Sequence, residues 1–245
     1  MAFEPKFPPA SSPVELRLLK EYGAVFLTHA IPPPKIIFDD EEDVVAFQKT
    51  LQARRSSIGE FEIELQSIAM DALEAASRLA KEKGISISAR SEDSGGRSYQ
   101  QTLSLWSRNV ERGLQHWIGA GRMTGERAQS VRLLATPEQI AAVLEMEESE
   151  NLFFSTYCDK SILQSVAAPG ASQHLALLAF DLAEYQDEAA EAILSEHGWH
   201  RTVLSDLPHF TYIGCKQDEL PRLGLRLVVR KYDSAMYRFW IPDIQ

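Results

Sequence analysis

Residues 172–182 read Ser-Gln-His-Leu-Ala-Leu-Leu-Ala-Phe-Asp-Leu, an apolar stretch with one carboxylate inside it. The run from Leu175 to Leu182 is long enough for a buried strand, and only Asp181 interrupts its apolar character. A carboxylate is costly to bury unless it is paired or coordinates a metal ion. The pattern therefore predicts a buried strand whose aspartate is either paired with another charged group or bound to a metal ion.

Two histidines complete a candidate metal site with Asp181. His174 lies seven residues earlier, so it is expected on the turn that enters the strand, because an odd spacing would otherwise place it on the opposite face. His209 follows Asp206, Leu207 and Pro208 just before a second strand-like segment. Two imidazole nitrogens and one carboxylate oxygen suit Zn²⁺, with a fourth position left for water.

The rest of the chain predicts an α+β fold, with a mainly antiparallel sheet that carries the zinc site and is flanked by helices. Apolar periodicity indicates helices near residues 44–51, 60–83, 98–118, 136–146 and 187–197. Alternating or apolar runs indicate strands at 24–27, 85–89, 175–182 and 209–213, and a terminal pair at 223–229 and 236–241. We expect residues 1–55 to form an N-terminal arm and helix packed on the core. Residues 56–245 would then form the metal-bearing domain with its C-terminal strand pair.

Composition excludes two classes of partner. The formal net charge of −10 disfavours nucleic acid and anionic membranes, which would repel the chain. No apolar run approaches the roughly 20 residues that span a bilayer. The N-terminus lacks the apolar core of a signal peptide. The predicted location is the cell envelope if an export signal was trimmed from this chain, and the cytoplasm otherwise; the oligomeric state is left open.

The two cysteines are too few for a disulfide framework and lack the spacing of a CxxC motif. We expect Cys158 and Cys215 to be small apolar fillers of the core. A single disulfide between them is the alternative.

Three segments resemble the motifs of the zinc D-alanyl-D-alanine carboxypeptidases and dipeptidases, relatives of the hedgehog signalling domain. Residues 172–181 (SQHLALLAFD) resemble the SxHxxGxAxD motif. Residues 206–214 (DLPHFTYIG) resemble the ExxH segment with its following aromatic strand and glycine, and residues 94–99 (SGGRSY) resemble SGYRSY. The motifs occur in the family's order, and the resemblance covers roughly residues 60–215.

The resemblance implies a hedgehog-like, D,D-peptidase-like fold and a zinc metallopeptidase that cleaves peptidoglycan peptides ending in D-amino acids. The Zn²⁺ ligands would be His174, Asp181 and His209. Asp206 would accept the proton of the attacking water and pass it to the leaving amine. Arg97 would pair with the substrate carboxylate or stabilise the oxyanion, and Ser172 would contact the substrate near the metal.

Four positions depart from the family pattern. Leu177 replaces the motif glycine, Gly96 replaces the tyrosine of SGYRSY, and Thr102 replaces a glutamine. Asp206 replaces the glutamate of ExxH and reaches roughly 1.5 Å less, about one carbon–carbon bond. The alternative to an enzyme is therefore a zinc-stabilised module that binds peptidoglycan or a protein partner without cutting it.

Overall fold

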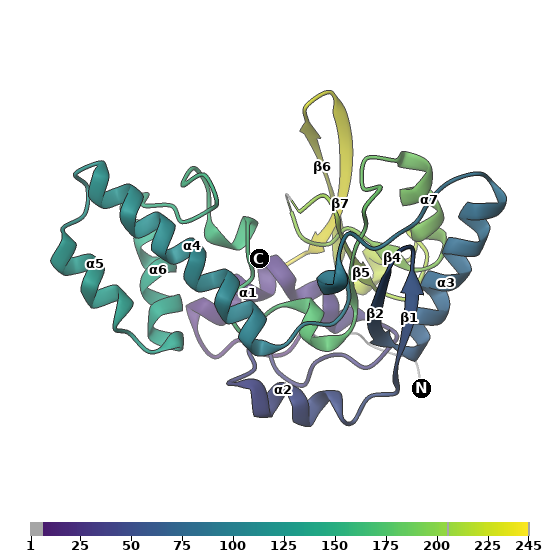
Figure 1. The fold of residues 1–245 in the computed structure, drawn as a ribbon, viewed down its shortest axis with the longest axis horizontal. Coiled ribbons are helices and arrows are strands. Elements are labelled where there is room, and N and C mark those ends of the chain that lie inside the picture. The colour runs from purple at the N-terminus through teal and green to yellow at the C-terminus, as the bar shows by residue number, and fades with distance from the viewer. Residues whose placement is uncertain (1–6, 205, 245) are drawn as a thin grey trace.

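The structure is a computed structural model that describes residues 7–204 and 206–244. This part of the chain has a mixed α+β architecture with seven α-helices and three small antiparallel sheets (Figure 1). The helices are α1 (Pro13–Tyr22), α2 (Glu41–Gln48), α3 (Ser67–Glu82), α4 (Tyr99–Gly119), α5 (Gly125–Arg132), α6 (Thr136–Glu150) and α7 (Glu188–Glu196). The strands are β1 (Ala53–Ile58), β2 (Phe61–Gln66), β3 (Ala179–Asp181), β4 (Trp199–His200), β5 (His209–Tyr212), β6 (Leu225–Tyr232) and β7 (Ala235–Pro242). The predicted α+β class and antiparallel pairing are confirmed at this level.

The two largest apolar cores lie in different halves of the molecule. Helices α4, α5 and α6 lie together on one side of Figure 1, and they share a core with α1 that includes Leu18, Trp106 and Leu144. The other half packs α3 and α7 against the β1–β2 hairpin and the three-stranded sheet β3–β5–β4, around residues such as Leu73 and Phe180. The candidate metal ligands lie in elements that border both halves.

Helix α4 shows how local sequence sets the helical half. The Ser98 hydroxyl accepts from the backbone N–H of Gln101, and the Gln101 side chain accepts from the backbone N–H of Ser98. This capping box satisfies two N–H groups that a helix start leaves unpaired. Trp106, Val110 and Leu114 then recur every four residues and are buried. The predicted helix over 98–118 is confirmed.

The predicted helix over residues 60–83 is wrong in its first part. Residues 53–66 form the β1–β2 hairpin, which turns at Gly59 and Glu60 before α3 begins at Ser67. Gly59 has a φ of +73°, a conformation that glycine adopts readily in tight turns. Ile63 and Leu65 are buried, whereas Glu62 and Glu64 are exposed or half-buried, which is the strand period, although the spacing of Ile63 and Leu65 also fits a helix stripe.

Three smaller predictions also change. Residues Gly23–Leu27 form a 3₁₀ helix and not a strand, and residues 85–89 contribute only the bridge from Ala89 to Leu182. The apolar run 175–182 divides into a 3₁₀ turn and the short strand β3. Helix α5 escapes sequence detection because its exposed, polar sequence buries only Ala128 and Val131.

Helix α7 and the C-terminal pair β6–β7 occur where they were predicted. Cys158 and Cys215 are buried free thiols, as expected for apolar fillers. Among the described residues, no helix has the length and apolarity to cross a membrane.

The buried His200 on β4 predicts an acid-sensitive fold. Its Nε2 lies 2.9 Å from the carbonyl of Cys215, and burial lowers the pKa of this histidine to about 4. Because an unfolded histidine takes up its proton near pH 6.5, the unfolded state binds more protons between pH 6.5 and pH 4. The free energy of unfolding should therefore fall across this window, by about 3 kcal/mol from His200 alone.

This loss can be measured by urea unfolding of the metal-free protein at pH 7 and pH 4. In a His200→Gln variant, the difference between the two pH values should shrink by the contribution of His200. Parallel pH profiles for the wild type and the variant would contradict the assignment.

Candidate metal centre

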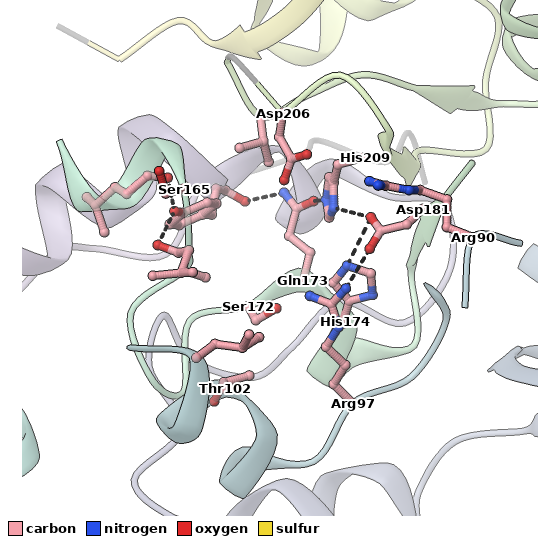
Figure 2. A pocket seen from close by; sticks show the side chains of 16 residues that line it. Arg90, Arg97, Thr102, Ser165, Ser172, Gln173, His174, Asp181, Asp206 and His209 are labelled. Carbon is pink, nitrogen blue, oxygen red and sulfur yellow. Dashed lines mark hydrogen bonds and ion pairs between the residues drawn. The ribbon is translucent and has the colours of Figure 1, made fainter. Parts of the chain in front are cut away.

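Strand pairing brings two of the three predicted ligands together. In the antiparallel pair β3–β5, Asp181 is the direct partner of His209. His174 lies on the 3₁₀ turn Gln173–Ala176 that precedes β3, as its odd spacing from Asp181 requires. Figure 2 shows all three side chains directed toward one another. Their candidate ligand atoms lie within 4.8 Å of one another.

The distances within this triad match those of a tetrahedral metal site. The Oδ1 atom of Asp181 lies 3.5 Å from Nε2 of His174 and 3.3 Å from Nδ1 of His209. Two ligand atoms that are each bound to one zinc ion at a tetrahedral angle lie about 3.4 Å apart. Oδ1 of Asp181 could therefore share an ion with either imidazole after little movement, and all three candidate atoms lie within 4.8 Å of one another.

The protonation of His174 also suits a ligand. Its Nδ1 lies 2.5 Å from the carbonyl of Gly95, and because a carbonyl only accepts, Nδ1 carries the proton. Burial is the main cause that lowers the pKa of His174 to about 4, so the ring is neutral near pH 7. Its Nε2 lone pair then faces Asp181.

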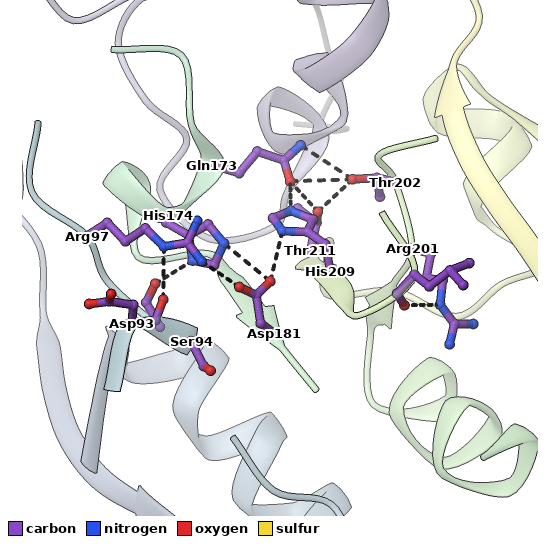
Figure 3. A network of polar contacts seen from close by, with 12 residues as sticks. Asp93, Ser94, Arg97, Gln173, His174, Asp181, Arg201, Thr202, His209 and Thr211 are labelled. Carbon is purple, nitrogen blue, oxygen red and sulfur yellow. Dashed lines mark hydrogen bonds and ion pairs between the residues drawn. The ribbon is translucent and has the colours of Figure 1, made fainter. Parts of the chain in front are cut away.

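The two oxygens of Asp181 have separate partners. Oδ2 accepts from Nη2 of Arg97 at 2.5 Å, which leaves Oδ1 directed at the two histidines (Figure 3). Burial opposes ionisation of Asp181, whereas the guanidinium of Arg97 at Oδ2 stabilises the charged carboxylate. The triad thus presents a carboxylate oxygen beside an unprotonated imidazole nitrogen. A cation at the centre satisfies this arrangement, so the group could hold a metal ion.

The triad forms one end of a cavity of about 250 Å³ between the two halves of the molecule. Asp206 and Ser172 line the same cavity, and Figure 2 shows the Asp206 carboxyl directed toward the space beside Gln173 and His209. Burial raises the pKa of Asp206, the nearby His209 opposes the rise, and the charge of Asp181 adds to it. The farther wall is more apolar and includes Leu105, Leu163, Val166, Ala167 and Val203.

Two arginines reach this cavity, and they have different surroundings. Arg97 is engaged by Asp181 and also donates from Nε to the carbonyl of Asp93. Arg90, which sequence reasoning missed, is held beside the centre because its backbone N–H donates to the carbonyl of Asp181. Its guanidinium lies over the ring of Tyr185, and no carboxylate in the described part of the chain pairs with it. The sequence signal that could have identified Arg90 is its position at the end of a predicted strand, next to the SGGRSY segment.

Two departures from the family pattern prove to be complementary. Leu177 has a φ of +56° at the turn between the 3₁₀ helix and β3, a left-handed conformation that favours glycine. A Cβ atom on Gly96 would lie only 2.5 Å from Cδ2 of Leu177. The Leu177 side chain therefore occupies the space beside position 96, which can hold only glycine without rearrangement.

Comparison with models of known protein families, with curated proteins and with solved structures gave no match. The interpretation of the centre consequently depends on its own geometry and on the sequence motifs.

Proposed function

We propose that the chain is a zinc-dependent peptidase that hydrolyses peptides with a free carboxylate end, with cell-wall peptides ending in D-amino acids as the substrate class. The observation that carries this proposal is the convergence of the His174, Asp181 and His209 ligand atoms within 4.8 Å of one another at the end of a cavity. The sequence resemblance to the zinc D,D-peptidases supports the choice of reaction.

The donor set favours zinc over other metals. Two imidazoles and one carboxylate are typical of catalytic zinc sites that keep one position open, whereas Mg²⁺ and Ca²⁺ prefer oxygen ligands. A bound zinc ion would act as a Lewis acid and lower the pKa of a coordinated water to about 7. Arg97 would hold Asp181 in place by donating to the Oδ2 atom of Asp181, which leaves Oδ1 of Asp181 for the ion.

Asp206 is the proposed general base. Its carboxylate borders the same cavity as the triad and would accept the proton of the attacking water, then deliver that proton to the amine that leaves. His209 follows three residues later on β5, so the chain holds the base and a ligand on one short segment. The backbone N–H of His209 donates to the carbonyl of Asp206 at 3.3 Å, which restricts the geometry of this segment.

Arg90 is the proposed anchor for the substrate carboxylate. Arg97 is already paired with Asp181, while Arg90 lines the same cavity and forms no ion pair with a carboxylate of residues 7–204 or 206–244. Guanidinium groups bind carboxylates in two parallel hydrogen bonds. Ser172 lines the cavity near the triad and would add a hydroxyl contact to the bound peptide.

Replacing Arg90 with Gln should therefore raise KM for peptides with a free C-terminal carboxylate by about 10- to 100-fold, the value of a charge-assisted hydrogen bond. The same peptides with an amidated C-terminus should show no such difference between the wild type and the variant. Arg230→Gln, on the exposed face of β6, is a matched control and should leave both KM values unchanged. Equal effects of Arg90→Gln on the acid and the amide would contradict the anchor role.

The function itself is tested with zinc-loaded protein and three substrates: a peptide ending in D-Ala-D-Ala, an L-Ala-D-Glu peptide and intact muropeptides. We expect cleavage of at least one, loss of cleavage on chelation, and recovery on adding zinc. A His174→Ala variant should bind no zinc and cleave none of them. Stoichiometric zinc with no cleavage of any substrate would instead identify a binding module.

A further inference from the structure

We propose that Gln173 is a positioning residue of the metal centre, and that the carbonyl of Tyr22 at the end of α1 sets its orientation. This inference rests on the metal site of the proposed function, but it does not depend on peptide cleavage. It concerns one hydrogen-bonded chain that runs from the N-terminal helix to the ligand His209.

The orientation of the Gln173 amide follows from its partners. Gln173 is almost fully buried, and its Nε2 lies 2.8 Å from the backbone carbonyl of Tyr22. Because a carbonyl has no hydrogen to donate, the NH₂ end of the amide must face Tyr22. The Oε1 end therefore faces the opposite way, toward β5.

The Oε1 atom in turn determines which ring nitrogen of His209 carries the proton. It lies 2.8 Å from Nε2 of His209, and it also accepts from the hydroxyl of Thr211 (Figure 3). Since Oε1 can only accept, Nε2 of His209 carries the ring proton. In the neutral ring Nδ1 is then the unprotonated nitrogen, and it is the atom that faces Oδ1 of Asp181. This is the tautomer that a metal ligand needs.

The chain of contacts makes the N-terminal helix part of the centre. Helix α1 lies outside the segment that resembles the zinc peptidases, yet its last residue orients the amide that orients His209. The hydroxyl of Tyr22 also donates to the carbonyl of Leu163, on the cavity wall, so the same residue is held at both ends. Through Tyr22, helix α1 therefore contributes to the orientation of a metal ligand.

The test compares two buried glutamines. Gln66 is about as buried as Gln173, and it too bonds to the N-terminal segment, through Ile31. Its Nε2 also donates to the carbonyl of Ala176 on the turn that carries His174, but its side chain makes no hydrogen bond to a metal ligand. In the full chain, Gln173→Leu should weaken Zn²⁺ binding by about 10- to 100-fold, the usual effect of losing such a supporting contact. Gln66→Leu should leave the Zn²⁺ dissociation constant unchanged, although it also removes buried hydrogen bonds. Competition titration with a chromogenic chelator measures both constants.

A second measurement needs no variant. In the metal-free wild type, at a pH where the His209 ring is neutral, ¹⁵N chemical shifts of His209 should report protonation at Nε2 alone, and in Gln173→Leu they should report a mixture of tautomers. Protonation at Nδ1 in the wild type, or a Zn²⁺ dissociation constant in Gln173→Leu equal to that of Gln66→Leu, would overturn the inference. Wild-type protein that binds no zinc would overturn it together with the proposed function. Protein that binds zinc, shows the expected shift in affinity and cleaves no peptide would leave the inference standing and remove only the peptidase function.

Discussion

Replacing Asp206 with Asn is expected to lower kcat by about 10²- to 10⁴-fold, the usual contribution of a general base. The asparagine keeps the size of the side chain but cannot accept the proton of the attacking water. Because Asp206 is not one of the three candidate metal ligands, the zinc content should stay at the wild-type level. Steady-state kinetics and elemental analysis of the same preparation measure both quantities.

Two further variants sharpen this result. Asp218→Asn removes an exposed carboxylate from the loop after β5 and should leave kcat unchanged. Asp206→Glu restores the residue of the family motif but adds about 1.5 Å of reach. In an enzyme whose backbone has adapted to aspartate, this change should slow turnover. A faster Asp206→Glu enzyme would instead indicate that the wild-type chain binds zinc with little catalysis.

The second large effect concerns stability. Replacing Glu147 on α6 with Ala should lower the free energy of unfolding by about 2 to 5 kcal/mol, because it leaves two buried backbone N–H groups unsatisfied at about 1 to 3 kcal/mol each. The Glu147 carboxylate accepts from the backbone N–H groups of Phe154 and Ile162, and from the side chains of Ser161 and Arg17. Its side chain has no solvent exposure. The variant leaves the two N–H groups without their acceptor, whereas the Arg17 guanidinium keeps the Leu144 carbonyl and the Ser161 hydroxyl as acceptors.

Urea unfolding of zinc-free protein measures this loss, and Glu150→Ala is the matched control. Glu150 lies on the same helix, but it forms an exposed pair with Arg127. Such surface pairs contribute less than about 1 kcal/mol. Comparable losses for Glu147→Ala and Glu150→Ala would show that the buried carboxylate does not organise the loop after α6.

The Glu147 network also bears on the cavity. Glu147 holds the backbone of the segment that leads to Leu163 and Val166, two residues of the apolar cavity wall. Arg17 connects this network to α1, whose last residue, Tyr22, bonds to Gln173. The helical half is thereby joined to the metal centre through a series of buried polar contacts.

Local sequence determined much of the secondary structure. Long helices such as α4 were predictable because capping residues and a periodic apolar stripe occur together. The β1–β2 hairpin was not, because Ile63 and Leu65 fit both a strand and the stripe of the following helix. Only the pairing with β1 decides between the two periods. That pairing is a contact with another segment, so the apolar pattern of residues 60–66 alone does not reveal it.

The three candidate ligands could be predicted from the sequence, because a carboxylate in an apolar run needs a partner. One histidine, His174, precedes that run, and the other, His209, begins a second strand-like segment. Tertiary structure alone decided their neighbours. It paired Arg97 with Asp181, brought Arg90 to the cavity, and placed the Tyr22 carbonyl against Gln173. Backbone carbonyls carry no sequence signal, and contacts across 151 residues of chain exist only once both halves have packed.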